Sequence, residues 1–147
     1  MANYQEAFAY AFSHPSEYLR GDYPIWRCLT LKPLLLAEGF SDDEQYTLFE
    51  KIYAPELWRQ CKGDQITDQK VAGLLLLINA KGYLATMLKE MQSYFNITPT
   101  SQMCERTLYQ LNRLPKSALL DWLDTGLQYF SLVQNKRHES YFLCENG

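Results

Sequence analysis

The sequence predicts a mainly α-helical fold in one domain over residues 1–147, with little or no sheet. Apolar residues recur every three or four positions along much of the chain, which is the spacing of amphipathic helices. Residues 71–78 are apolar on all sides, as expected of a buried central helix. A chain of 147 residues with 47% apolar side chains is long enough for one core and too short for two ordinary domains.

The first helix is expected over residues 4–12, and Pro15 ends its apolar pattern. Residues 21–24 have the composition of a turn. Residues 25–30 are compatible with a short extended piece or an irregular loop, and the pattern leaves the choice open. Residues 31–36 are expected to form a short helix.

Ser41 is followed by three acidic residues, which is a capping box with acids in the first turn of a helix. We therefore expect a helix over residues 41–52. Pro55 permits a second short helical turn, because proline is tolerated at a helix start. Residues 62–64 are expected to form a loop.

Residues 67–70 open the central helix, and Gly82 ends or kinks it. Residues 83–95 carry apolar side chains on one face and predict an amphipathic partner helix. Residues 96–101 are expected to form a loop. Either Thr100 or Ser101 is expected to cap the helix that follows.

Pro115 precedes the last long helix. Its apolar residues are expected to face inward. They are Leu119, Leu120, Trp122, Leu123, Leu127, Tyr129, Phe130 and Leu132.

Charge and composition exclude several classes of function. The net charge is -3 and no basic stripe is present, so the sequence does not favour nucleic acid as a partner. No segment has the length and apolarity of a signal peptide or a membrane span, and we expect a cytoplasmic protein, without excluding export by a dedicated route. No cofactor is indicated. The four cysteines are widely spaced and the chain has two histidines, which argues against a metal site and for free thiols.

Several fragments, taken in order, resemble the muramidases of glycoside hydrolase family 108, which belong to the lysozyme superfamily and occur in phages and secretion loci. The resemblance implies a single lysozyme-like helical domain over residues 1–147. His14 and Tyr18 resemble the residues that flank the family's Glu-Gly-Gly-Tyr signature. The most specific similarity is Ile52-Tyr53 followed by Leu57-Trp58, which resembles Ile-Tyr-x-x-x-Tyr-Trp. The other similar fragments are Phe8 with Ala11, Leu29-Thr30, Val71-Ala72, Ile78-Asn79 with Gly82, Met91-Gln92, Tyr129-Phe130 and Phe142-Leu143.

The chain departs from this family at the residues that carry the chemistry. In the alignment set by His14 and Tyr18, Pro15 stands at the catalytic glutamate, and proline has no proton to donate. An isoleucine, Ile25, stands at the active-site threonine. An aspartate that the family has before the position of Asn79 falls near Leu75.

Glycoside hydrolysis needs a protonated carboxylic acid beside the leaving oxygen and a second group that stabilises the sugar cation or positions water. Glu17 is the acid nearest the first role, and Asp22 is the candidate for the second. The alternative is that Glu17 caps a turn in solvent. His14 or His138 as a general base has no Ser-His-acid or Cys-His pattern to support it.

Aromatic residues are abundant, with eleven tyrosines, seven phenylalanines and three tryptophans. They provide large contact areas with a polar tip, and they suit stacking on sugar rings or contact with a protein. Trp58 and Trp122 fit helical stripes and are expected to be structural. The residues expected to form the binding site are His14, Tyr18, Tyr23, Trp26, Thr30, Tyr53 and Asn79.

Three functions remain open. The first is a degenerate muramidase-like protein without hydrolase activity, which binds a peptidoglycan fragment or a protein partner. The second is an active peptidoglycan muramidase that uses Glu17 as a displaced acid. The third is an unrelated small helical adaptor or inhibitor, of a kind that phages encode. The oligomeric state does not follow from the sequence.

Overall fold

The computed structural model describes residues 1–12, 44 and 47–146, and in the last helix it describes side chains as far as Phe130 and at Leu132. The described residues are mainly helical and contain no strand, which confirms the mainly α class. Their elements in chain order are α1 (Tyr4–Phe12), the π-helix η2 (Phe49–Tyr53), α5 (Ala54–Gln60), the 3-10 helix η3 (Gly63–Gln65), α6 (Gln69–Ala80), α7 (Leu84–Tyr94), α8 (Glu105–Arg113) and α9 (Lys116–Asn146).

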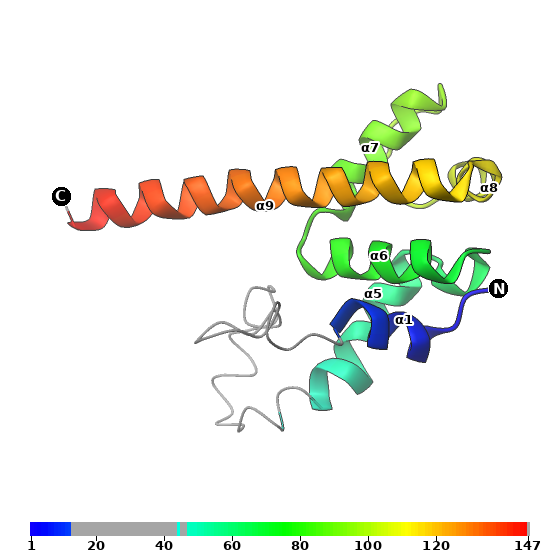
Figure 1. Cartoon of the computed structure of the whole chain (residues 1–147), viewed down its shortest axis with the longest axis horizontal. Helices are drawn as coiled ribbons and strands as arrows, with labels where there is room; N and C mark the ends of the chain where they lie inside the picture. Colours follow the sequence, from blue (N-terminus) through cyan, green and yellow to red (C-terminus); the bar gives the residue numbers. More distant parts are fainter. Residues whose placement is uncertain (13–43, 45–46, 147) are drawn as a thin grey trace.

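Helix α6 lies at the centre of the described fold. Helices α1 and α5 pack on one side of it and α9 on the other (Figure 1). This placement explains why the segment is apolar all round, because residues 71–78 are all buried. Gly73 lets α1 approach closely, since a Cβ at this position would lie 2.6 Å from Cδ1 of Tyr10. The prediction of a buried central helix is confirmed.

The N-terminal segment is fastened to the start of α6. The backbone N–H of Ala2 donates to the carbonyl of Ile66 at 2.9 Å. Asn3 and Gln69 exchange two hydrogen bonds, of 2.8 and 3.0 Å. These contacts fix α1 over residues 4–12 as the sequence predicts.

The expected helix over residues 41–52 lies partly outside the described residues, including its capping box. Its described end adopts a π-helical form at η2 and continues directly into α5, where Pro55 occupies the first turn. The hydroxyl of Tyr4 donates to the carbonyl of Glu50 at 2.5 Å and joins η2 to α1. The residues expected as a loop after α5 include the 3-10 turn η3, closed by a 2.8 Å bond from Nε1 of Trp58 to Oδ1 of Asp64. Trp58 is buried, so its structural role is confirmed.

The prediction that Thr100 or Ser101 caps the next helix is wrong. Helix α8 begins at Glu105 with Cys104 as its N-cap residue. The backbone N–H groups of Thr100 and Ser101 both donate to Oε1 of the buried Gln92, at 2.9 and 3.2 Å. They serve to hold the loop after α7 against that helix.

Helix α9 begins at Lys116 as expected, and its last part extends past the other described helices (Figure 1). Leu119, Leu123 and Leu127 are buried as predicted. Three other residues of the expected inward stripe are exposed instead. They are Trp122, Tyr129 and Leu132. The structural role expected for Trp122 is therefore wrong as well. In the described part of the chain, no helix is long and apolar enough to cross a membrane.

Candidate functional site

Most residues of the sequence-predicted site lie outside the described residues. These are Glu17, Asp22, His14, Tyr18, Tyr23, Trp26 and Thr30. Tyr53 and Asn79 are described, and both belong to the packing of α5. Tyr53 is half-buried at the end of η2, immediately before α5. Asn79 holds the other end of α5, and no hydrogen bond joins the two residues.

The side chain of Asn79 is hydrogen-bonded to the end of α5. Its amide nitrogen donates to the carbonyl of Leu57 at 2.9 Å and to Oε1 of Gln60 at 3.0 Å. An amide NH₂ has two hydrogens, and both are used in tying α6 to the end of α5. This nitrogen therefore has no hydrogen left for a ligand.

Leu75, near which the family resemblance places an aspartate, is fully buried within α6. Its carbonyl accepts a long contact of 3.6 Å from Sγ of Cys61. Burial raises the pKa of the Cys61 thiol to about 12, so this cysteine is a packed apolar group rather than a nucleophile. This part of the core is a packed interior.

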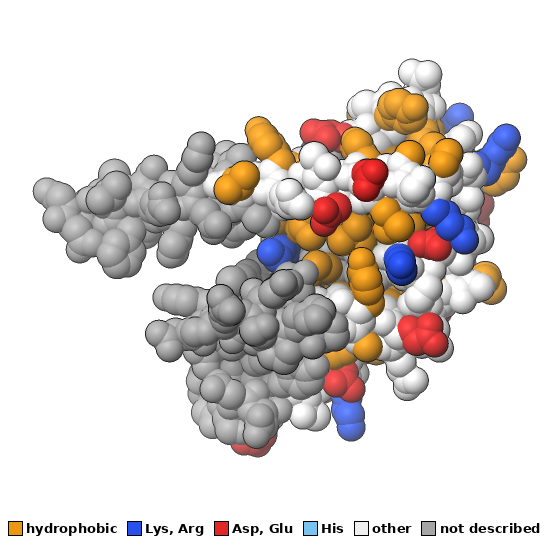
Figure 2. Space-filling view, viewed as in Figure 1, with side chains coloured by type: hydrophobic (Ala, Val, Ile, Leu, Met, Phe, Trp, Pro, Cys, Tyr) orange, Lys and Arg blue, Asp and Glu red, His pale blue; other side chains and the backbone are white. Residues whose placement is uncertain are grey.

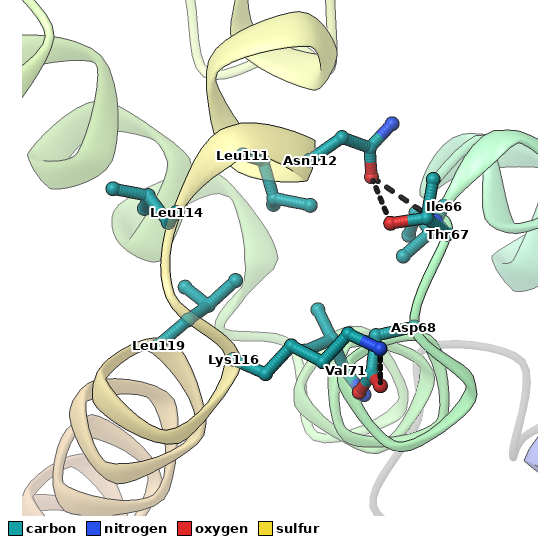
Figure 3. Close-up of a pocket in the computed structure, with 9 residues that line it drawn as sticks. All are labelled: Ile66, Thr67, Asp68, Val71, Leu111, Asn112, Leu114, Lys116 and Leu119. Carbon is teal, nitrogen blue, oxygen red and sulfur yellow. Dashed lines mark hydrogen bonds and ion pairs between the residues drawn. The ribbon is translucent and has the colours of Figure 1, made fainter.

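A small cavity with polar contacts at its edge lies where α8, α9 and the start of α6 meet (Figure 3). Oδ1 of Asn112 accepts from the backbone N–H and the hydroxyl of Thr67, at 3.1 and 3.4 Å. Asp68 caps α6 by accepting from the N–H of Val71 at 3.0 Å, and its other oxygen lies 3.4 Å from Nζ of Lys116. The cavity between them measures about 40 Å³, room for about one to three water molecules. The contacts around this cavity hold the three helices together, and the cavity is too small for an organic ligand.

A much larger groove lies between α7 and α9. Its volume is about 410 Å³. The groove residues are Glu90, Met91, Tyr94, Phe95, Leu114, Ala118, Leu119 and Trp122. Tyr94 is 77% exposed and Trp122 is 39% exposed, so two aromatic rings stand at its edges in contact with solvent. Figure 2 shows apolar side chains on the outer part of α7 and at intervals along α9.

The lining of this groove is almost uncharged. Among the described residues that line it, Glu90 is the only one with a formal charge. The polar groups beside it are the hydroxyl of Tyr94 and the indole N–H of Trp122. A groove of this kind binds apolar side chains and offers few hydrogen bonds.

The second described cysteine, Cys104, is half-buried at the N-cap of α8. Its Sγ lies 3.0 Å from Oγ1 of Thr107, and this hydrogen bond lowers the pKa of the thiol. Within the described ranges, no three side chains among His, Cys, Asp and Glu come together as metal ligands.

No protein-family model, no curated protein and no solved structure matches this chain.

The groove was not among the sites that sequence reasoning proposed. Its signal was present in the last helix, where Ala118, Trp122, Tyr129 and Leu132 share one face. Because the neighbouring face is apolar too, periodicity places Trp122, Tyr129 and Leu132 in the expected inward stripe and gives Ala118 no separate role.

Proposed function

We propose that this chain is a muramidase-like helical domain that has lost hydrolysis and acts as a binding module for a protein partner. The observation that carries the proposal is the groove between α7 and α9. It is apolar, has aromatic edges and measures about 410 Å³. Exposed tyrosine and tryptophan beside an apolar floor are typical of the anchor points of protein interfaces.

The chemistry of the groove favours a protein segment over a glycan fragment. Each sugar ring carries several hydroxyl groups, and a bound sugar must exchange their hydrogen bonds with water for hydrogen bonds with the protein. The described lining supplies one carboxylate, one phenol and one indole N–H, from Glu90, Tyr94 and Trp122. An apolar side chain of a protein needs none of these groups and gains from burial against Leu119 and Met91.

Two described residues support the loss of hydrolysis. Leu75 is a buried side chain near the position where the muramidases that the sequence resembles have an acid, and Asn79 is engaged in hydrogen bonds to α5. Both observations agree with Pro15, which replaces the catalytic glutamate in the alignment.

The binding function is tested with peptides selected from a random library displayed on phage. We expect the selected peptides to share an aromatic or large aliphatic anchor. Ala118→Arg places a long charged side chain in the groove and is expected to weaken their binding by about tenfold or more. Ser117→Arg, the adjacent exposed position on α9, is the matched control and should leave binding unchanged. Peptides that bind both variants equally contradict the proposal, and so does a chain that selects no peptide and forms no protein complex through the groove.

The loss of hydrolysis is tested by turbidity of purified cell wall. Wild type and Glu17→Gln should both leave the suspension turbid. Clearing by the wild type that disappears in Glu17→Gln means that Glu17 is a displaced catalytic acid, and the proposal fails.

A further inference from the structure

Helix α9 carries an exposed stripe of residues with a coiled-coil spacing. The α9 stripe consists of Ala118, Trp122, Thr125, Tyr129 and Leu132. Its members follow one another at intervals of four, three, four and three residues, and all five fall within about 80° of the helix circumference. Tyr129 is 62% exposed and Leu132 is 60% exposed. The stripe extends for about 21 Å along the helix axis.

The α9 stripe is separate from the face that packs into the core. The core face is held by the buried Leu119, Leu123 and Leu127. Helix α7 crosses α9 beside this face, since a Cβ at Gly126 would lie 2.6 Å from Cε of Met87. Among the described residues, no element covers the stripe at Tyr129 and Leu132, and its first members, Ala118 and Trp122, line the groove beside α7.

Large and small side chains alternate along the α9 stripe. Trp122 and Tyr129 are large, whereas Ala118 and Thr125 are small. A stripe of this kind is complementary to itself when two copies run antiparallel, because the large residues of one helix meet the small residues of the other. In the register that sets Trp122 opposite Thr125 of the second copy, Tyr129 lies opposite Ala118 of the second copy.

The groove supplies the space that this register requires. Ala118 lines the groove, and the groove is hollow beside it because alanine is small. Tyr129 of a second copy would enter there and contact Trp122 and Leu119. Since the relation is symmetric, both grooves of the pair are filled in the same way.

We infer that a second copy of this chain occupies the groove, through antiparallel pairing of the two α9 stripes about a two-fold axis. The inference rests on the proposed function, because it takes the same groove as a binding surface and names the partner. Self-complementarity of one exposed stripe is the reason to choose a second copy over an unrelated protein. A segment of an unrelated protein does not by itself account for the alternation of large and small residues or for the space beside Ala118, whereas a second copy fits both.

Sedimentation velocity of the full chain over a wide concentration range tests the inference. We expect a concentration-dependent dimer. Trp122→Asp and Tyr129→Asp should each raise its Kd by about 30-fold or more, because each places a charge at an aromatic anchor that the dimer would bury. Tyr109→Asp changes an exposed tyrosine on α8, outside the stripe, and should leave the Kd unchanged. Circular dichroism of each variant verifies that the helices are intact.

An exchange of side chains tests the register. Ala118→Tyr alone opposes two large residues, and Tyr129→Ala alone leaves a gap, so each should weaken the dimer. The double variant Ala118→Tyr with Tyr129→Ala restores one large and one small residue at each contact and should recover the dimer. Recovery supports this register, and its absence overturns it.

The outcomes separate this inference from the proposed function. A wild-type chain that remains monomeric, or a dimer that Trp122→Asp leaves intact, overturns the second copy as the occupant. If selected peptides still bind the groove of that chain, the proposed function stands without the inference. If neither a dimer nor peptide binding occurs, both fail.

Discussion

Gln92 is expected to be one of the most sensitive polar positions of the described fold. Its side chain is fully buried. Nε2 donates to the carbonyl of Gln102 at 2.7 Å and to Oγ1 of Thr107 at 3.1 Å. Oε1 accepts from the backbone N–H groups of Thr100 and Ser101 at 2.9 and 3.2 Å. One side chain thus holds the loop after α7 and the start of α8, close to the end of the groove.

The variant Gln92→Leu keeps the approximate volume and removes all of these bonds. At about 1 kcal/mol net for each, the four bonds set an upper value of about 4 kcal/mol. The loop groups lie near the surface and regain hydrogen bonds to water, whereas the buried Thr107 keeps only its contact with Sγ of Cys104. We therefore expect a loss of about 2–3 kcal/mol in the free energy of unfolding.

Chemical denaturation measures this loss directly, and thermal unfolding should show a fall in Tm of about 5–10 °C. Gln102→Ala is the control, because Gln102 contributes its backbone carbonyl while its side chain is exposed, and we expect a change within about 0.5 kcal/mol. If Gln92→Leu is as stable as Gln102→Ala, the hydrogen bonds of Gln92 do not hold the loop and the reasoning fails.

Three further predictions concern stability. Burial raises the pKa of the Cys61 thiol to about 12, above the value of about 8.5 for an unfolded thiol. The protonated thiol therefore contributes its full stability below pH 8.5, and this contribution is lost as the pH rises toward 12. The free energy of unfolding, measured against pH, should fall more steeply at alkaline pH for wild type than for Cys61→Ala. Asp68→Ala should lower the free energy of unfolding by about 1 kcal/mol or more, because it removes the N-cap of α6. Lys116→Ala should lower it by under about 0.5 kcal/mol, because the Lys116 side chain is 69% exposed. Equal losses for the two variants in chemical denaturation contradict this prediction. Gly63→Ala should cost about 1–3 kcal/mol, because its Cβ would lie 2.2 Å from the ring of Trp58, and a neutral effect on Tm excludes that close contact.

The sequence was informative wherever a local pattern decides the structure. The bounds of α1 and the start of α9 follow from apolar spacing and proline positions, and the burial of α6 follows from its uninterrupted apolar run. The start of α8 was misplaced because Gln92 holds Thr100 and Ser101 in a loop, where its Oε1 accepts from both of their backbone N–H groups. That side chain is eight or nine residues distant in sequence, and no local pattern indicates it.

The candidate site was harder to predict than the fold. Seven of the nine binding and catalytic candidates lie outside the described residues, so their roles stay predictions. Asn79 was selected by resemblance, and its hydrogen bonds show a structural use that resemblance alone does not reveal. The groove is not predicted from the sequence, because Met91, Leu119 and Trp122 of its lining belong to the apolar stripes that indicate a core.

The ambiguity of α9 has a definite physical cause. Apolar residues cover two neighbouring faces of this helix, so periodicity alone cannot decide which face is buried. The structure decides it through contacts with α7 and the residue before it. Met87 packs at Gly126, where a Cβ would lie 2.6 Å from its Cε, and the ring of Phe130 lies 5.2 Å from that of Tyr83. These contacts set the rotation of α9 and leave Trp122 and Tyr129 facing outward. A helix that keeps large aromatic residues on its outer face forgoes the burial of their apolar area in the monomer, and binding of a partner there recovers it.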